Sequence, residues 1–145
     1  MVKGRCLCGD IEFEIELIPG QVYSCHCSIC QRSHGAAFAT QALAKGNSLS
    51  FISGQEKLAE YFSGGGFRAF CSNCGSRLMN YAKNKDDYLS VAISCLENKN
   101  ELSPVGNVCI ETKMGWYQPA SNIPSYEGIP KEILEEAIPS SAPAP

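Results

Sequence analysis

Seven of the nine cysteines in this chain fall into three short clusters, and this spacing constrains the fold more than any other feature. The clusters are Cys6-x-Cys8, Cys25-x-Cys27-x-x-Cys30 and Cys71-x-x-Cys74. Thiolates one or two residues apart can turn toward a single ion, and this spacing is typical of zinc sites. A closed structural zinc site takes four protein ligands, whereas a catalytic site takes three and leaves one position open. The clusters therefore predict one zinc that stabilises the fold and one that takes part in chemistry.

The first and last clusters predict the closed site. Its ligands would be Cys6, Cys8, Cys71 and Cys74. A glycine directly follows each pair, at a point where a tight turn can need the positive φ that glycine adopts at little cost. Such a site would tie together two segments that lie far apart in the sequence.

The central cluster supplies only three thiolates, from Cys25, Cys27 and Cys30, and it predicts the open site. His26 stands between two of these ligands, so its side chain should point to the opposite side. A closed second site is the alternative, and a site without metal is a further one. The candidates for a fourth ligand are His34, Cys95 and Cys109, of which the two cysteines stand near expected strands and would otherwise be buried, inert thiols.

Length and charge exclude several classes of protein. The chain has 145 residues, about one domain's length, with 44% hydrophobic residues and a formal net charge of −3. An acidic balance is a poor match for a phosphate backbone, so we expect no nucleic-acid partner. No stretch approaches the ~20 apolar residues of a membrane span, and no apolar signal segment precedes the first cysteines. An odd cysteine count then favours reduced thiols and a cytoplasmic protein.

Short alternating runs predict a mainly β fold. Residues 11–17 alternate apolar and acidic side chains, the pattern of a strand with one buried face, and Pro19-Gly20 should end this strand in a turn. Further strands are expected near residues 21–23, 37–40, 49–52, 58–62, 67–70, 88–93 and 108–110. One short helix is predicted from Pro130 to Ala137, followed by a disordered Pro-rich tail at 139–145.

The cysteine motifs, taken with their neighbours, resemble the glutathione-dependent formaldehyde-activating enzyme family, which includes centromere-protein-V-like members. The residues that carry the resemblance are Gly4-Arg5-Cys6-Leu7-Cys8-Gly9, Cys25-His26-Cys27-Ser28-Ile29-Cys30-Gln31-Arg32 with Gly35-Ala36, and Phe70-Cys71-Ser72-Asn73-Cys74-Gly75-Ser76. Matches at Lys113, Gly115-Trp116 and Ile123-Pro124 extend it, so that it defines a domain over residues 1–130 and leaves the helix and tail at 131–145 outside.

This resemblance implies an Mss4-like zinc-binding fold of several coiled antiparallel sheets, with one short C-terminal helix. It implies that the four-cysteine set holds a structural zinc and that Cys25, Cys27 and Cys30 hold a catalytic one. The reaction it implies is the reversible condensation of glutathione with formaldehyde to S-hydroxymethylglutathione, a carbon–sulfur lyase chemistry. The chain departs from the family pattern at Gln31, where many relatives carry a basic residue, and at His34, where a small or hydroxylated residue is commoner.

Several residues could serve a thiol–aldehyde substrate. His34 is the titratable group best placed in the sequence to move a proton, and Arg32 and Lys113 could bind substrate carboxylates. Trp116 could form a pocket wall, and Arg68, next to a triple glycine, could reach the site if that loop moves. Each also has a plain alternative, as a surface charge or a core aromatic. A thiol-binding carrier and a two-zinc structural module remain alternatives to an enzyme, and either a monomer or a homodimer is possible.

Overall fold

The structure is a computed structural model and describes residues 1–63 and 65–133. Within these residues the fold is mainly β, as predicted. The strands are β1 (Val2–Arg5), β2 (Glu12–Ile15), β3 (Leu17–Cys25), β4 (Ala39–Ala44), β5 (Ser50–Ser53), β6 (Leu58–Phe62), β7 (Phe67–Cys71), β8 (Arg77–Tyr81), β9 (Leu89–Ala92) and β10 (Gly106–Val108). The helices are α1 (Ser28–His34) and five 3-10 turns, η1 (Gly46–Ser48), η2 (Gln55–Lys57), η3 (Ile93–Cys95), η4 (Lys99–Glu101) and η5 (Ile110–Thr112).

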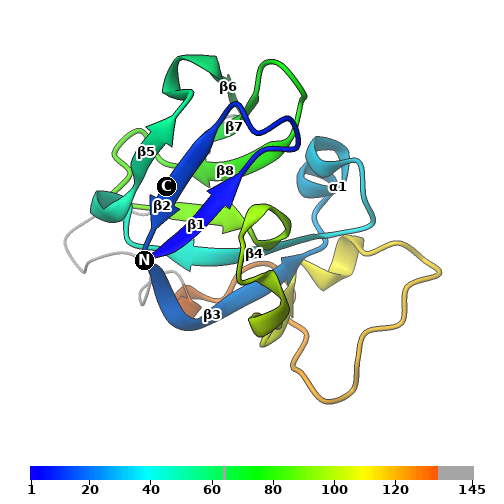
Figure 1. Ribbon diagram of the computed structural model, residues 1–145. Coiled ribbons are helices and arrows are strands. Elements are labelled where there is room, and N and C mark those ends of the chain that lie inside the picture. Colours follow the sequence, from blue (N-terminus) through cyan, green and yellow to red (C-terminus); the bar gives the residue numbers. More distant parts are fainter. Residues whose placement is uncertain (64, 134–145) are drawn as a thin grey trace.

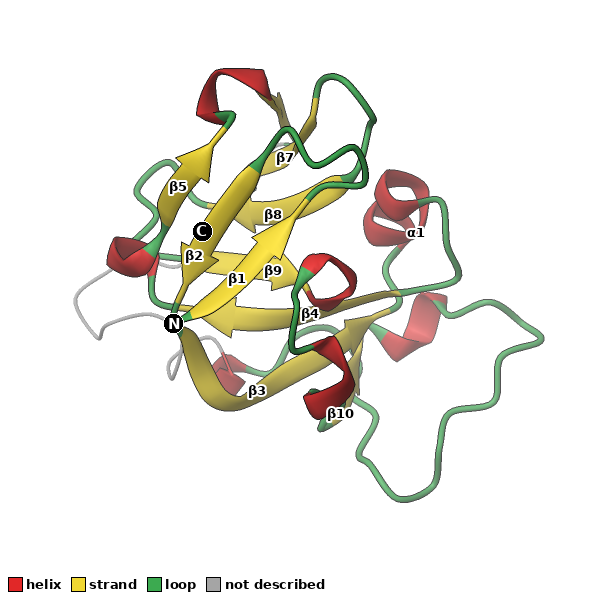
Figure 2. Ribbon diagram, in the orientation of Figure 1, coloured by secondary structure: helices red, strands yellow, loops and turns green. Residues whose placement is uncertain are grey.

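The strands form two sheets, consistent with an Mss4-like fold. The smaller sheet has the order β1-β2-β5 and the larger has the order β10-β3-β4-β9-β8-β7-β6. The smaller sheet lies against the larger one, as Figures 1 and 2 show. Neighbouring strands in both sheets pair antiparallel, as expected, with one exception: β10 runs parallel to β3.

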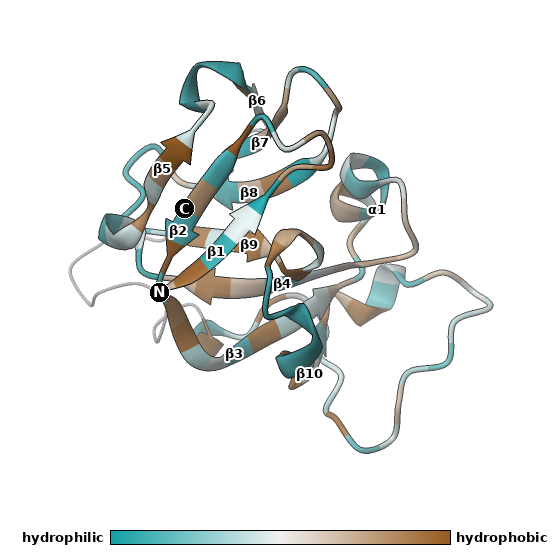
Figure 3. Ribbon diagram, viewed as in Figure 1, coloured by the Kyte–Doolittle hydropathy of each residue, from teal (hydrophilic) through white to brown (hydrophobic). Residues whose placement is uncertain are grey.

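The core lies between the two sheets and confirms the alternation in the sequence. Ile11, Phe13 and Ile15 are completely buried, while the glutamates between them keep part of their surface in water. Their partners from the larger sheet include Leu78 and Val91, which are also completely buried. Figure 3 shows the matching hydrophobic colour along β4. Burial of each such side chain contributes about 1.5–3 kcal/mol. Because side chains alternate between the two faces of a strand, the apolar face of the smaller sheet packs against the larger sheet.

Three local predictions are wrong in detail. Pro19-Gly20 does not end a strand, because both residues lie inside β3, where the pairing with β4 shifts register and absorbs the irregularity. The predicted strand at 11–17 is divided between β2 and β3. Strands β1 and β8 and helix α1 were not predicted, because β1 and α1 each bury a single residue and the buried residues of β8 do not alternate strictly, so none of the three leaves a clear periodic signal.

The predicted C-terminal helix is described only at its start. Residues 131–133 are helical, and the Ile133 amide donates to the carbonyl of Pro130 at 3.2 Å. The rest of that helix and the tail at 139–145 lie outside the described residues. No helix in the described part of the chain is both long and apolar enough to cross a membrane.

Candidate functional site

The four cysteines predicted as a closed metal site lie together at the junction of the two sheets. Their sulfur atoms all lie within 4.8 Å of one another. The Sγ atoms of Cys6 and Cys8 are 3.5 Å apart, and those of Cys8 and Cys71 are 3.9 Å apart. Cys6 follows β1 of the smaller sheet and Cys71 ends β7 of the larger one. A metal ion held here by Cys6, Cys8, Cys71 and Cys74 would therefore link the sheets.

Both cysteine turns have the backbone that the sequence predicts. Gly9 has a φ of 82° and Gly75 a φ of 78°, in the left-handed region that favours glycine. The Leu7 amide donates to the Ser76 hydroxyl at 2.8 Å, which joins the two turns directly. Hydrogen bonding to Ser76 also lowers the pKa of the Cys74 thiol to about 5, so this ligand favours the thiolate form. The turns are thus preorganised for a cation.

The second cluster forms where β3 passes into α1. The sulfurs of Cys25, Cys27 and Cys30 lie within 4.8 Å of one another. Cys27 caps the helix, because its sulfur accepts from the Cys30 amide at 3.2 Å, and Gly35 ends it with a φ of 61°. The end of β3 and the first turn of α1 therefore bring three thiols close together, and this cluster could hold a second metal ion.

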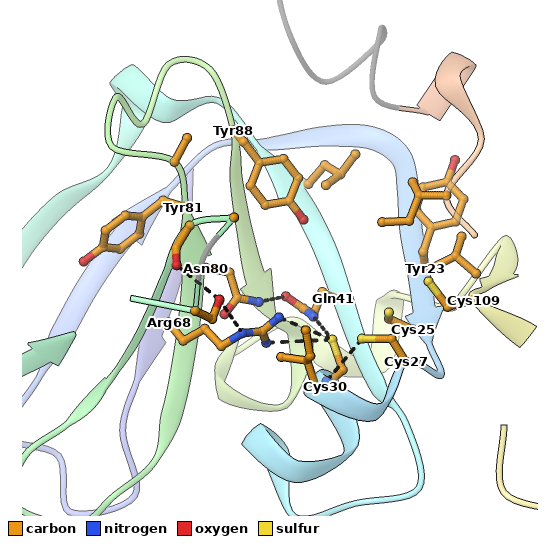
Figure 4. A pocket seen from close by; sticks show the side chains of 18 of the residues that line it. Tyr23, Cys25, Cys27, Cys30, Gln41, Arg68, Asn80, Tyr81, Tyr88 and Cys109 are labelled. Carbon is orange, nitrogen blue, oxygen red and sulfur yellow. Dashed lines mark hydrogen bonds between the residues drawn. The ribbon is translucent and has the colours of Figure 1, made fainter. Parts of the chain in front are cut away.

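This three-cysteine group opens onto a pocket of about 360 Å³. The walls are mainly aromatic and aliphatic, with Tyr23, Leu43, Phe67 and Ile129 among the lining side chains. Arg68 is the one charged side chain among the described residues that line it. Figure 4 shows the sulfurs along one side of this space, with Arg68 beside them. The pocket therefore suits a small, partly apolar molecule that carries a polar or anionic group.

A polar network converges on the Cys30 sulfur from the larger sheet. Arg68 on β7 approaches it with both terminal guanidinium nitrogens, at 3.8 and 3.9 Å, and the Gln41 amide nitrogen on β4 lies at 4.0 Å. The Gln41 carbonyl accepts from Asn80 at 2.5 Å and from buried Ser90 at 2.7 Å. These contacts fix the amide so that its N–H groups face the sulfur (Figure 4). Such outer contacts orient a ligand and moderate its negative charge.

The closeness of the thiols in this cluster shifts their pKa values in opposite directions. Hydrogen bonds from Cys109, Cys25 and Cys30 hold the pKa of the Cys27 thiol far below its usual range. The pKa of the Cys25 thiol is raised mainly by its contact with Cys109 and next by that with Cys27. The pKa of the Cys30 thiol is raised mainly by its contact with Cys25 and next by that with Cys27. One thiolate thus forms readily, and its neighbours keep their protons unless a cation compensates the added charge.

Tyr88, just before β9, also lines the pocket and faces the cysteine side in Figure 4. Burial raises the pKa of its hydroxyl, so Tyr88 keeps its proton at neutral pH. The other phenols that line the pocket are engaged elsewhere, because the Tyr81 hydroxyl donates to Glu60 and the Tyr23 hydroxyl donates to Gln21. Tyr88, whose hydroxyl also contacts Ser90, is therefore a neutral hydrogen-bonding group on the pocket wall.

Cys109 is the one alternative fourth ligand that lines this pocket, and its thiol contacts those of Cys25 and Cys27. Cys95 lies elsewhere, in a hollow shared with Cys6 and Cys74, and burial raises its pKa to about 12. His26 points away from the cluster, as expected: it is completely buried, and its Nε2 atom lies 3.0 Å from the side-chain amide oxygen Oδ1 of Asn107.

The other residues predicted to serve the substrate do not line this pocket. Arg32 is exposed on α1, and both Arg32 and His34 line a hollow shared with the four-cysteine region. Lys113 donates to the Tyr117 carbonyl at 3.0 Å, and Trp116 is 71% exposed. The structure thus brings together the three cysteines and Arg68, whereas the roles assigned to Arg32, His34, Lys113 and Trp116 stay predictions.

Gln31, the departure from the family pattern, has a structural role here. Its amide nitrogen donates to the carbonyls of His26 and Thr112, both at 2.9 Å. The contact joins α1 to the segment after β10.

Sequence reasoning did not assign Gln41, Asn80 or Tyr88 to the site. One available signal was the presence of Gln41, beside Thr40, in a run of otherwise apolar residues; in the structure this run is β4 and Gln41 is 9% exposed. A buried amide usually has a specific partner, and here its partners are the pocket's polar groups.

Comparisons with known proteins agree with the cysteine pattern. The family model described as glutathione-dependent formaldehyde-activating enzyme matches residues 1–112. The chain is also similar to a Rhodobacter sphaeroides protein of known crystal structure, with 25% sequence identity and a TM-score of 0.56, over 85% of this chain and 98% of that one. None of the curated proteins compared with the chain matches it. With its two cysteine clusters in place and most of its length matched, the chain belongs to the glutathione-dependent formaldehyde-activating enzyme family.

Proposed function

We propose that this protein is a zinc-dependent carbon–sulfur lyase that acts on the adduct of a small thiol with an aldehyde. The default substrate is S-hydroxymethylglutathione, formed from glutathione and formaldehyde. One observation carries the proposal: three clustered thiols face a pocket whose walls are apolar and whose one charged described residue, Arg68, contacts a cysteine of the cluster. Family membership supports the reaction class, and the pocket supports a small-molecule substrate.

Zinc fits the donor sets of both clusters. Thiolate sulfur is a preferred zinc ligand, and sulfurs within 4.8 Å of one another can converge on an ion at about 2.3 Å from each. The four-cysteine set would supply all four ligands of a closed zinc site, while the three-cysteine set would leave a position on its pocket side for a substrate. Bound there, zinc would supply a soft Lewis-acid centre that favours a substrate thiolate over the thiol, whose ordinary pKa is about 8.5.

The residues around the pocket would orient the reacting groups. In adduct formation a carbon–sulfur bond forms between the thiol sulfur and the aldehyde carbon, and the aldehyde oxygen gains the proton that the thiol loses; cleavage reverses both changes. Arg68 and Tyr88 can donate hydrogen bonds toward that oxygen or toward a substrate carboxylate. The apolar walls limit the access of water, which would otherwise compete for the aldehyde.

Metal analysis and an exchange measurement test this function together. The reduced wild-type protein should bind two zinc ions and the Cys27→Ala variant one. Magnetization-transfer NMR measures the rate of exchange between free formaldehyde and S-hydroxymethylglutathione. The wild-type protein should accelerate this exchange, and the Cys27→Ala variant should not.

Two results would contradict the lyase proposal. If glutathione changes the thiolate-to-metal charge-transfer spectrum of the cobalt-substituted protein but exchange is not accelerated, the protein is a thiol-binding carrier. If two metals bind and the spectrum ignores glutathione, the second site is closed and structural.

A further inference from the structure

The thiol of Cys109 lies beside the three-cysteine group although it is distant from it in sequence. It contacts the thiols of Cys25 and Cys27 and lines the same pocket. Figure 4 shows the sulfurs of Cys109, Cys25, Cys27 and Cys30 following one another along one side of that pocket. Cys109 is not part of the group whose sulfurs all lie within 4.8 Å of one another, so it stands next to that group rather than inside it.

The backbone holds Cys109 in this place by contacts on both sides. Val108 pairs with Cys25 in the parallel ladder of β10 and β3, and its carbonyl accepts from the His26 amide at 3.0 Å. The Cys109 amide donates to the Gly128 carbonyl at 2.8 Å. The segment at Val108 and Cys109 therefore lies directly beside the turn that carries Cys25 and Cys27, and the Cys109 thiol lies on the side of that turn where the other thiols are.

Cys109 also has an uncommon backbone conformation. Its φ of 54° makes it the one described non-glycine residue with a positive φ. A left-handed conformation is unfavourable for a residue that carries a Cβ atom. The cost is retained at the point where the side chain meets Cys25 and Cys27, and such strain is commonest at functional positions.

We propose that Cys109 is an exchangeable fourth ligand of the metal ion held by Cys25, Cys27 and Cys30. The inference rests on the proposed function, since it assumes a thiol substrate. Cys109 would complete the coordination when no substrate is present and would leave when a substrate thiol takes its place. Its sulfur would then hold the proton that the substrate thiol loses until the aldehyde oxygen takes it up, so the exchange would leave the charge of the metal site unchanged. The Cys109 sulfur lies beside the group of three rather than inside it, which suits a ligand that binds the metal ion reversibly.

A Cys109→Gly variant tests this, because glycine accepts the positive φ and removes the thiol. The matched control is Cys95→Ala, which removes a half-buried thiol outside the pocket. In the cobalt-substituted proteins, Cys109→Gly should keep two metals but lose one thiolate's share of the charge-transfer absorption. Glutathione should bind it about tenfold or more tightly than wild type, because a tethered competitor has been removed. Cys95→Ala should match wild type in both measurements.

The outcomes separate the inference from the function on which it rests. If Cys109→Gly has the same charge-transfer spectrum and the same glutathione affinity as wild type, Cys109 is not a ligand and the inference is wrong. If the spectra of both proteins still change on adding glutathione, the proposal of a thiol-accepting metal site stands. If the variant loses one thiolate's absorption but neither protein responds to glutathione, Cys109 is a permanent ligand, and both the exchange and the proposed function are wrong. If Cys109→Gly does not fold, Cys109→Ser provides the same comparison.

Discussion

At the scale of single residues, Arg68 is the side chain that most distinguishes the candidate site. It donates to the Cys30 sulfur and to the Ser63 hydroxyl, so its guanidinium is held at the pocket edge. A guanidinium offers several N–H donors in one plane, and two contacts leave others for a ligand. Arg68 can therefore serve the cysteine cluster and an anionic substrate group together.

Replacing Arg68 with methionine should weaken glutathione binding about 10–100-fold, because a hydrogen bond to a charged group contributes about 1.5–3 kcal/mol. Two metals should remain, because the thiols are unchanged. Titration of the cobalt-substituted protein measures the affinity, with Arg5→Met, an exposed arginine at the end of β1, as control. An unchanged affinity in Arg68→Met would exclude the assigned role, and a loss in Arg32→Met would support the sequence-based assignment instead.

His34 makes the stability of the folded protein depend on pH. Burial and the nearby charges of Arg77 and Arg68 lower the pKa of its imidazole to about 4. The ordinary value is about 6.5, so below that pH the unfolded chain binds the proton more readily and the free energy of unfolding falls.

Between about pH 7.5 and about pH 5.5, wild type should lose about 1 kcal/mol more stability than His34→Gln. Urea unfolding at the two pH values measures this difference. Parallel losses in both proteins would show that His34 is not the group responsible. Turnover measured on His34→Ala tests its predicted catalytic role separately: a fall with both metals retained would support that role, and unchanged turnover would remove it.

At the scale of elements, the turn between β5 and η2 approaches the first cysteine turn very closely. Gly54 starts η2 with a φ of 75°, and a Cβ atom on it would lie 2.0 Å from the Asp10 carbonyl oxygen. Asp10 in turn accepts from Lys57 at 2.7 Å and from Asn73 at 3.1 Å. This glycine thus lets the smaller sheet dock beside the four-cysteine cluster.

Gly54→Ala should lower the free energy of unfolding by roughly 2–4 kcal/mol, from the strained φ and the overlap together. Gly20→Ala is the matched control, because Gly20 has a φ of 73° but no atom within 4 Å of its Cβ position. It should lose only about 1 kcal/mol. Equal losses in urea unfolding would mean that the close approach contributes nothing.

At the scale of the whole molecule, the two cysteine clusters have different relations to the fold. Cys6 and Cys71 connect the two sheets and are almost completely buried. The group around Cys27 instead lies at one end of β3, where a short helix and a pocket surround it. Metal at the first cluster should therefore support the entire domain, and metal at the second should serve the pocket.

Cys71→Ser should lose the β circular dichroism signal or unfold at much lower urea, because the link between the sheets fails. Cys27→Ser should lose one metal and keep the wild-type dichroism spectrum. Metal analysis and circular dichroism on both variants check this contrast. A folded, stable Cys71→Ser protein would contradict the structural assignment, and an unfolded Cys27→Ser protein would assign the second metal to the fold.

The sequence alone determined the two groups of cysteines that could hold metal ions and the class of the fold. Thiols one or two residues apart can reach a single ion through one tight local turn, so Cys25-x-Cys27-x-x-Cys30 predicts a ligand group without knowledge of the fold. The same holds for the alternation from Ile11 to Leu17, since strand periodicity is a local property. The resemblance to the family depends on these same local motifs.

Only the tertiary structure decided what surrounds the second cluster. Gln41, Arg68, Tyr88 and Cys109 come from, or from beside, different strands of the larger sheet, and strand order and register set which of their side chains meet. No local pattern encodes that Arg68 lies against Cys30, because β7 reaches that position through its pairing with β8, which in turn pairs with β9. Pairing between distant strands therefore made the pocket, while the spacing of neighbouring cysteines made its thiol group.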